Sequence, residues 1–428
     1  MKTEIKKLPQ SQVEMIIELD PTEWGKFIDE AARELSRDVK IDGFRPGQAP
    51  RAVVEQKVGL GKILEKAADL AVKENYVKAV RDNKLDVIGR PEIQVLKLAA
   101  DNPFEFKVKV AVMPEVKLGD YFKIAKSEKK ANREGIKVED KEAADSLSWL
   151  QKSRTKYVTI NRSAKMGDRV EVDFWVRQNG QVIEGGQSKN HPLILGESRF
   201  IPGFEEQLVE MKEGETKIFS LPFPADYYVK NLAGQLLDFE VKMNLVQESL
   251  VPEPTDEFAK SLGQFADLAA LKQNVKDGLI EEKMQKAKEM WRGRVLNKIV
   301  KDSKMEVPPA LVEMERVKMM EEFKNNLAQM GLEFDVYLEN LKKTEQELLR
   351  EWSGKAEERV KGALVLEEIA NKEEIQVAEA EIEAEINKTF AHYPDWQALK
   401  SQIDKKQLSE YTKGRLRNEK VFELLERF

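Results

Sequence analysis

The residues that usually carry out covalent or metal chemistry are almost absent from this chain. Its 428 residues include no cysteine, which excludes disulfides, thiolate zinc sites and cysteine nucleophiles. The two histidines, His191 and His392, are too far apart in sequence to suggest a metal site. No glycine-rich loop that could cradle phosphates is visible, so we expect neither ATP nor any other cofactor. Acidic pairs such as Glu205-Glu206 are expected to be solvated faces rather than acid/base pairs.

A short run near the start of the chain is built to present side chains. It reads Gly43-Phe44-Arg45-Pro46-Gly47-Gln48-Ala49-Pro50. Two glycines and two prolines in eight residues predict a rigid turn. Phenylalanine and arginine at its tip are residue types that often anchor interfaces. Taken in isolation, the run would be read as a plain loop between two helices.

This run resembles the docking signature of the trigger factor family, G-F-R-x-G-x-x-P. Gly43, Phe44, Arg45, Gly47 and Pro50 all fit the signature. The resemblance implies that the tip binds a protein at the rim of the ribosomal exit tunnel and nearby ribosomal RNA. Members often carry lysine after the arginine, where this chain has Pro46.

Residues 166–246 resemble an FKBP-type prolyl isomerase domain. The matching pieces are Val172-Asp173-Phe174, Glu184-Gly185-Gly186, Leu195-Gly196, Ile201-Pro202-Gly203-Phe204-Glu205 and Asp238-Phe239-Glu240-Val241. The resemblance implies a proline cup whose site residues are Phe174, Glu184, Phe200, Ile201, Phe204, Tyr227 and Phe239. It also implies two donors, the backbone N–H of Ile201 and the hydroxyl of Tyr227.

The chemistry of prolyl isomerisation suits such a set of residues. Rotating an X-Pro amide must overcome a barrier of about 18–20 kcal/mol, because amide resonance is broken on the way. An apolar cup favours the twisted, less polar amide, and neither a nucleophile nor a metal is required. Two positions depart from the family pattern, since Ile183 and His191 stand where aromatic residues are common.

A third region is rich in methionine and other apolar residues between positions 305 and 334. Methionine is flexible and polarizable, so a surface made of it can adapt to many partners. We expect about half of these side chains to face a helical core and half to face a shared client-binding cavity. The candidate client-binding residues are Met305, Val307, Leu311, Met314, Met319, Met320, Phe323, Met330 and Phe334.

The first 113 residues must position the docking run. Val13, Met15, Ile17 and Leu19 alternate with mostly polar neighbours, which predicts a half-buried strand. Asp20-Pro21-Thr22-Glu23 then predicts a helix start, with the helix continuing to about residue 38. A second helix is expected over residues 60–83, and its predicted buried residues are Ile63, Leu64, Leu70, Val77 and Val80. Strands around Ile93 and Val95 and over residues 104–112 complete a small α+β domain.

The remaining sequence changes character twice. Residues 114–150 are a charged linker ending in a short helix, with Leu147, Trp149 and Leu150 as its apolar contacts. Residues 151–247 alternate like a twisted antiparallel sheet on one helix, with a tight turn at Asn179-Gly180. Residues 248–428 are helical by composition, with breaks near Pro308-Pro309, Gly331 and Pro394. We therefore predict a multidomain α+β protein with an extended, all-helical C-terminal domain.

Charge and hydropathy limit the partners. Residues 1–113 carry 20 basic and 19 acidic side chains, whereas residues 248–428 carry 30 basic and 37 acidic ones. The acidic C-terminal region argues against wrapping nucleic acid. No stretch approaches the roughly 18 uninterrupted apolar residues of a membrane span, so a cytoplasmic protein is expected. The trigger factor resemblance implies that it is also partly ribosome-associated.

The order of these parts resembles the trigger factor family from end to end. The resemblance implies an ATP-independent, ribosome-associated chaperone that shelters nascent or unfolded polypeptides and isomerises X-Pro bonds. One alternative is a freestanding prolyl isomerase whose helical region forms a homodimer, and another is a structural scaffold without a client. The run at residues 43–50 favours the chaperone, because an isomerase does not need it.

Overall fold

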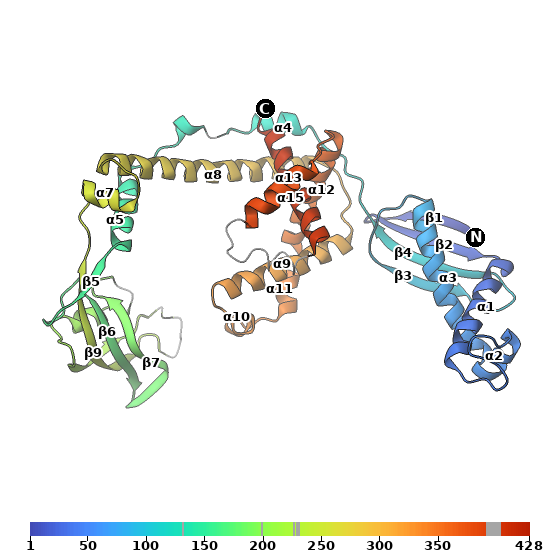
Figure 1. Cartoon of the computed structure of the whole chain (residues 1–428), viewed down its shortest axis with the longest axis horizontal. Helices are drawn as coiled ribbons and strands as arrows, with labels where there is room; N and C mark the ends of the chain where they lie inside the picture. Colours follow the sequence, from blue (N-terminus) through green and yellow to red (C-terminus); the bar gives the residue numbers. More distant parts are fainter. Residues whose placement is uncertain (131, 198–199, 226, 228–231, 391–403) are drawn as a thin grey trace. The chain divides into compact units, whose positions relative to one another are not determined.

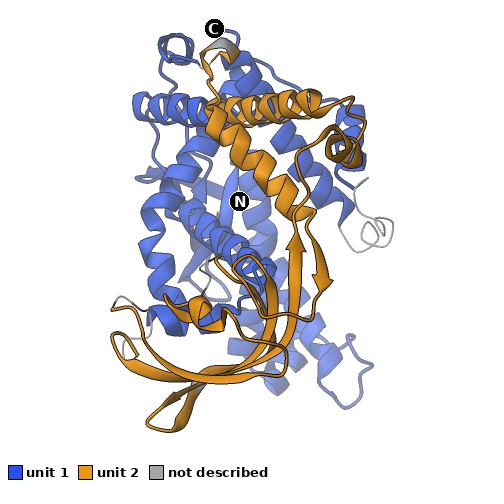
Figure 2. Ribbon diagram, turned by 90° about the vertical axis from the view of Figure 1, so that its left-hand side faces the viewer, with its two compact units in different colours: residues 1–130, 289–428 blue, residues 131–288 orange. Residues whose placement is uncertain are grey.

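The computed structural model describes residues 1–428 except 131, 198–199, 226, 228–231 and 391–403. It divides into two compact units, drawn in two colours in Figure 2. Unit 1 comprises residues 1–130 and 289–428, and unit 2 comprises residues 131–288. None of the described helices combines the length and the hydropathy needed to cross a bilayer.

The N-terminal part of unit 1 is an antiparallel sheet with helices on one face. The strand order is β1-β2-β4-β3, formed by β1 (Lys2–Leu8), β2 (Gln12–Leu19), β3 (Val87–Lys97) and β4 (Phe104–Val112). The helices are α1 (Pro21–Asp38), α2 (Arg51–Val58) and α3 (Leu60–Asp82) (Figure 1). The inward side chains of β2 and β4 and the buried faces of α1 and α3 share one hydrophobic core.

Local sequence signals account for most of this part. Asp20 caps α1, and its carboxylate accepts hydrogen bonds from the backbone N–H groups of Thr22 and Glu23, as predicted. The prediction for Val77 is wrong, because this side chain is 59% exposed. The buried stripe of α3 instead includes the small residues Ala67 and Ala71. Neither β1 nor α2 was predicted.

The helical part of unit 1 has its own core. Its helices are α4 (Tyr121–Ser127), the end of α8 (Leu268–Asp302), α9 (Pro309–Gln329), α10 (Phe334–Leu341), α11 (Glu345–Glu351), α12 (Ser353–Lys372), α13 (Glu379–Phe390) and α15 (Lys405–Leu425). Pro309 begins α9, and Gly331 (φ +72°) follows it, so these two predicted breaks are confirmed. Pro394 lies outside the described residues, as does His392. Tyr121 and Ala125 of the expected linker are buried in this core.

Unit 2 contains a five-stranded antiparallel sheet. Its elements are η1 (Arg133–Gly135), α5 (Asp140–Ser153), β5 (Lys156–Thr159), β6 (Arg169–Gln178), β7 (Gln181–Ile194), α6 (Phe204–Leu208), β8 (Thr216–Pro222), β9 (Leu236–Leu250), α7 (Asp256–Leu262) and the start of α8. The strand order is β5-β9-β6-β7, and β8 also pairs with β9. Phe204 and Leu208 of α6 are buried in the core of the sheet.

Two further predictions concern unit 2, one for its hairpin turn and one for α5. Asn179 and Gly180 both have positive φ, +52° and +83°, which confirms the predicted hairpin turn. Leu147 of α5 is buried, but Trp149 is 68% exposed, so its predicted apolar contact is wrong. The predicted fold class, an α+β multidomain protein with an FKBP-like sheet and a helical C-terminal region, is confirmed.

Candidate functional sites

An aromatic cluster lies between β6, α6 and β9. The rings of Phe200 and Phe204 stack with centroids 4.5 Å apart, and Phe174 meets Phe200 edge-on at 5.5 Å. Phe239 meets Phe204 edge-on at 5.5 Å. The structure therefore brings together four of the residues that the sequence assigned to a proline cup.

The members of this cluster differ in depth. Phe204 and Phe239 are buried, with exposures of 0% and 2%, so they belong to the core as well as to the candidate site. Four predicted site residues are half-buried at the edge of the same core, namely Phe174, Phe200, Ile201 and Tyr227. The side chain of Glu184 lies outside the described part of the structure.

Two aromatic residues of the cluster were missed at the sequence level. Phe219 stacks on Phe239 at 5.7 Å, and Phe223 meets Tyr227 edge-on at 4.7 Å. Phe219 lies on β8 directly opposite Phe239 in the antiparallel register. Both β8 and β9 were visible as strands in the sequence, but their pairing was not.

Backbone geometry fixes the entry to α6. Gly203 has φ +89°, and a Cβ there would lie 3.1 Å from Leu221, so this position favours glycine. Glu205 is only 5% exposed, and its carboxylate accepts a hydrogen bond from the N–H of Gly196 at 2.6 Å. The prediction that Glu205 lies on a solvated face is therefore wrong. Its carboxylate ties the end of the β7 region to α6.

The rim of the cluster is polar on one side. His191 meets Phe174 edge-on at 5.6 Å and Phe200 at 5.3 Å. The neighbouring Asn190 donates its N–H to Asp173, which also accepts from Asn244 at 2.6 Å. The rim thus offers an imidazole edge where the FKBP pattern would place another aromatic ring.

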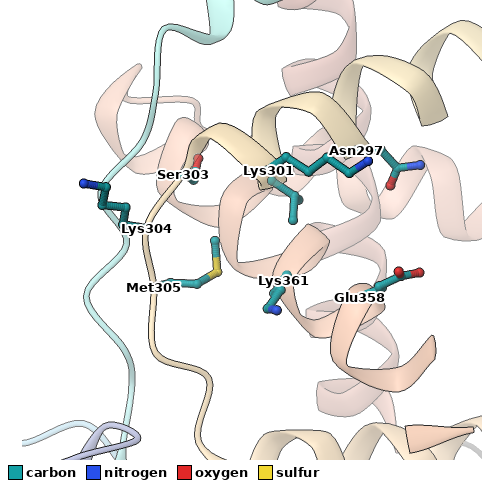
Figure 3. Close-up of a pocket in the computed structure, with 8 residues that line it drawn as sticks. Asn297, Lys301, Ser303, Lys304, Met305, Glu358 and Lys361 are labelled. Atoms are coloured by element: carbon teal, nitrogen blue, oxygen red, sulfur yellow. The ribbon is translucent and has the colours of Figure 1, made fainter. Parts of the chain in front are cut away.

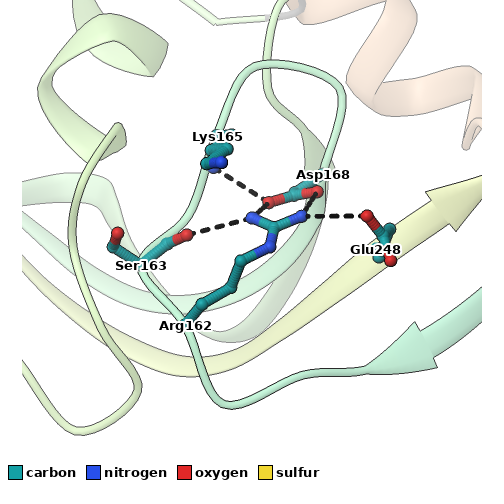
Figure 4. Close-up of polar contacts among 5 residues, drawn as sticks. All are labelled: Arg162, Ser163, Lys165, Asp168 and Glu248. Atoms are coloured by element: carbon teal, nitrogen blue, oxygen red, sulfur yellow. Dashed lines mark hydrogen bonds and ion pairs between the residues drawn. The ribbon is translucent and has the colours of Figure 1, made fainter.

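An ion pair secures the segment before β6 (Figure 4). Asp168 is 4% exposed and accepts from both terminal nitrogens of Arg162, at 2.6 and 3.0 Å. It also accepts from the backbone N–H of Lys165, while Arg162 reaches Glu248 at 3.3 Å. Hydrogen bonding to Asp168 raises the pKa of Arg162. This arrangement pins a loop to the sheet, so its polar groups serve the fold rather than chemistry.

The candidate docking run forms the loop between α1 and α2. Gly43 and Gly47 have φ +86° and +79°, and a Cβ on Gly47 would lie 3.0 Å from Arg37. The N–H of Gly47 donates to the carbonyl of Ser36, which fastens the loop to α1. Phe44 is 43% exposed, and Arg45 is also exposed. The structure therefore presents both tip side chains to solvent on a constrained backbone.

The candidate client-binding residues are distributed between core and surface. Met319 and Met320 are buried, whereas Met314 and Met330 are 57% and 72% exposed. The other five are half-buried, namely Met305, Val307, Leu311, Phe323 and Phe334. Phe323 contacts the rings of Phe334, Tyr337 and Trp352, so the aromatic members meet one another. Sequence reasoning missed Tyr337 and Trp352.

Met305 also lines a cavity of about 570 Å³ where α8 ends beside α12 (Figure 3). Its polar lining includes Lys301, Lys361 and Glu358. Lys361 forms an ion pair with Glu357 at 2.7 Å. The cavity is therefore mixed in charge, and Met305 contributes an apolar patch to it.

These features define a class of protein. A twisted antiparallel sheet on one short helix, with a cluster of aromatic side chains at its core, is typical of an FKBP-type domain. Residues 161–244 match the family described as FKBP-type peptidyl-prolyl cis-trans isomerase. Residues 1–148 match the bacterial trigger factor protein family, and residues 267–426 match its C-terminal region. The chain therefore belongs to the trigger factor family.

Individual relatives agree with this assignment. The chain is 37% identical to the trigger factor of Carboxydothermus hydrogenoformans, over 92% of this chain and 91% of the relative. It is 32% identical to the trigger factor of Shouchella clausii, over 99% of this chain and 98% of the relative. A solved structure from work on substrate recognition by the trigger factor chaperone matches with a TM-score of 0.57 and 24% identity. That match covers 100% of this chain and 99% of the other, and it shows a shared fold.

The buried carboxylate of Glu205 predicts a difference between two adjacent glutamates. Glu205→Ala removes the acceptor of the Gly196 N–H and should cost about 1–3 kcal/mol in the free energy of unfolding of this domain. Glu206→Ala is the matched control, because Glu206 is exposed and its loss should change little. Hydrogen exchange of the sheet amides in the full chain measures both. Equal protection in the two variants would contradict the anchoring role of Glu205.

Proposed function

We propose that this protein is an ATP-independent molecular chaperone that docks on the ribosome, shelters nascent chains and isomerises X-Pro bonds. The observation that carries the proposal is a group of exposed apolar side chains on α9, on α10 and on the loop between them. Its exposed residues are Met314, Val317, Met330, Leu332 and Val336, with exposures from 47% to 72%. Large uncovered apolar patches on a monomer usually mark a binding surface.

The composition of this surface suits many different clients. Met314 and Met330 are its two most exposed members. Methionine side chains have several rotatable bonds and a polarizable sulfur, so they fit irregular apolar partners of variable sequence. Membership of the trigger factor family supports the same function.

Docking is assigned to residues 43–50. The loop contains two prolines, whose rings fix φ, and the Gly47 N–H fastens it to α1, so it loses less conformational entropy on binding than a free loop does. An exposed arginine can pair with acidic side chains or with phosphates, and Phe44 can pack beside it. Ribosomal protein and RNA at the exit-tunnel rim are therefore the proposed partners.

Isomerisation is assigned to the aromatic cluster of unit 2. Phe204 and Phe239 would form its floor, while Phe174, Phe200, Ile201 and Tyr227 lie nearer the surface. Aromatic faces can bind a proline ring through both area and polarizability. The proposed donors to the substrate are the backbone N–H of Ile201 and the hydroxyl of Tyr227.

The docking proposal predicts that Phe44→Ala/Arg45→Ala abolishes most ribosome binding. Removing an exposed aromatic and arginine anchor should weaken affinity by about tenfold or more. The matched control is Ile5→Ala/Lys7→Ala, which removes an exposed apolar side chain and a cation from β1 of the same domain. Co-sedimentation with ribosomes measures all three proteins. Equal binding of wild type and the loop variant would remove this assignment.

The client surface predicts a loss of aggregation suppression when it is made polar. Replacing Met314, Val317, Met330 and Leu332 by serine should leave the fold intact, because these side chains are exposed. Light scattering of a refolding client without nucleotide should then approach that of the client alone. Ile218→Ser/Leu236→Ser is the control, since it removes apolar residues of 72% and 66% exposure from unit 2. If the control variant loses as much aggregation suppression as the α9–α10 variant does, the client surface does not lie on α9 and α10.

The isomerase assignment predicts opposite effects of two rim changes. Phe200→Ala should lower kcat/KM by about tenfold, since one aromatic wall is lost. His191→Phe should raise kcat/KM by extending the apolar rim. Phe204→Ala should abolish activity. Because Phe204 is fully buried, this variant should also lose several kcal/mol in the free energy of unfolding. A protease-coupled assay on a short X-Pro peptide measures kcat/KM for each variant, with Ile218→Ala as control. A wild-type rate equal to the uncatalysed rate would make residues 151–247 a binding module only.

A further inference from the structure

His191 lies at the rim of the aromatic cluster, on the core face of the sheet. It stands on β7 directly opposite Val172 of β6, which is a buried core residue. Its ring is half-buried and meets two walls of the proposed proline site edge-on, Phe174 at 5.6 Å and Phe200 at 5.3 Å. The site therefore has a titratable ring where its other walls are apolar.

Two irregularities of the sheet meet beside His191. Where β6 pairs with β7, Asp173 of β6 faces two residues of β7, Lys189 and Asn190, which makes a β-bulge. Asn190 has φ +48°. Where β6 pairs with β9, Asn244 is an extra residue on β9. Bulges commonly re-aim a neighbouring side chain, and His191 directly follows the first of these two.

Asp173 joins the two bulges. Its carboxylate accepts hydrogen bonds from the backbone N–H of Asn190 at 2.7 Å and from the side-chain amide of Asn244 at 2.6 Å. The same amide of Asn244 donates to the side-chain oxygen of Asn190 at 3.0 Å. The N–H that the bulge takes out of the ladder thus has an acceptor, and the backbone just before His191 is held in one geometry.

The charged groups around His191 are engaged elsewhere or exposed. Those described on the surrounding elements are Glu171 and Asp173 on β6, Lys189 on β7, Lys242 on β9 and Glu205 on α6. Glu171 forms an ion pair with Arg169 at 2.8 Å, and Glu205 accepts from the Gly196 N–H. None of these five described groups forms an ion pair with the imidazole. Histidine is the side-chain type whose charge most readily changes between about pH 5 and 8.

The two charge states of an imidazole differ in how well an apolar substrate can cover them. Water solvates an imidazolium at the rim while the site is open. A proline ring that covers the rim removes this water, and desolvation disfavours the charged form. The contacts of His191 with Phe174 and Phe200 are present before the substrate arrives, so they do not change the sign of this effect. An uncharged X-Pro segment should therefore bind better to the neutral ring.

We infer that His191 makes X-Pro isomerisation by unit 2 dependent on pH, with Asp173 as the positioning residue that holds His191 at the rim. The catalysed rate rises with pH as the imidazole loses its proton to the solvent. The inference rests on the proposed isomerase function, because it names the group that controls the same site. It makes the departure from the FKBP pattern at residue 191 a source of control, beyond a loss of apolar area.

The probe is a blocked, uncharged peptide with one X-Pro bond, studied with the full chain. NMR exchange spectroscopy measures cis/trans interconversion without a coupling protease, so the pH can be varied freely. The rate per mole of protein, in the linear range of peptide concentration, gives kcat/KM. For the wild type, kcat/KM should fall by about fivefold or more from pH 8 to pH 5.5, because the charged ring must lose its water.

Histidine variants assign this pH dependence to one ring. His191→Phe should change by less than about twofold over the same range, so its advantage over the wild type should grow as the pH falls. His392→Gln is the matched control, because His392 is the only other histidine in the chain. This control should keep the wild-type pH profile.

Asp173 variants test the positioning. Asp173→Asn keeps a side-chain oxygen that can accept from both donors, so the pH dependence should persist. Asp173→Ala leaves the Asn190 N–H without this acceptor, and the pH dependence should shrink to less than about twofold as His191 leaves the rim. If Asp173 only supported the fold, Asp173→Ala would lower the rate by the same factor at every pH. That result would overturn the positioning role.

The remaining outcomes separate the inference from the proposed isomerase function. Catalysis with equal kcat/KM at pH 5.5 and pH 8 would overturn the inference and leave the isomerase function standing. An equal pH dependence in wild type and His191→Phe would do the same, as would its loss in His392→Gln. A wild-type rate equal to the uncatalysed rate at every pH would refute the isomerase function, and the inference with it.

Discussion

The helical part of the chain depends on the burial of Tyr121, a residue far from the other helices in sequence. Tyr121 is 3% exposed and lies in one core with Trp291, Val295 and Val365. Its hydroxyl donates to Glu373 at 2.5 Å, and burial raises its pKa. The segment after β4 is therefore part of the helical core and not a free linker. The core therefore includes residues that precede unit 2 in the chain, Tyr121 and Ala125, together with residues that follow it.

Polar contacts explain how α9 is fixed while much of its apolar surface stays uncovered. Arg359 of α12 forms ion pairs with Glu315 and Glu322 of α9, both at 3.0 Å. Arg316 donates to the hydroxyl of Ser353 at 2.9 Å. Besides these contacts, α9 buries apolar residues such as Met319 and Leu327. The exposed methionines are thus compatible with a well-defined helix position.

Sequence predicted the elements that depend on local signals. The cap at Asp20, the alternation of β2 and β4 and the turn at Asn179-Gly180 are all set by neighbours in the chain. It did not predict β1, because the charged edge strand KTEIKKL shows no clear alternation. It misplaced Val77, Trp149 and Glu205, because their exposure depends on which distant segment packs against them.

The same limit applies to the candidate sites. Phe219 joins the aromatic cluster only because β8 pairs with β9, and this pairing is not encoded in the residues next to Phe219. Trp352 meets Phe323 only because the segment before α12 packs near α9. The residues that sequence did find, such as Phe204 and Phe44, lie in runs whose local pattern is itself distinctive. Long-range packing therefore decides the site residues that local patterns miss.

The depth of the aromatic cluster limits where its chemistry can vary. Phe204 and Phe239 are buried and contact several other rings, so a change at either one would disturb the domain core. The same side chains would form the floor of the proposed proline site. Variation that preserves the fold is therefore confined to the rim, where Ile183 and His191 are only half-buried. The two departures from the FKBP pattern lie at the positions where this constraint is weakest. A difference in activity between this chain and other FKBP-type domains should accordingly originate at the rim, while the floor stays aromatic.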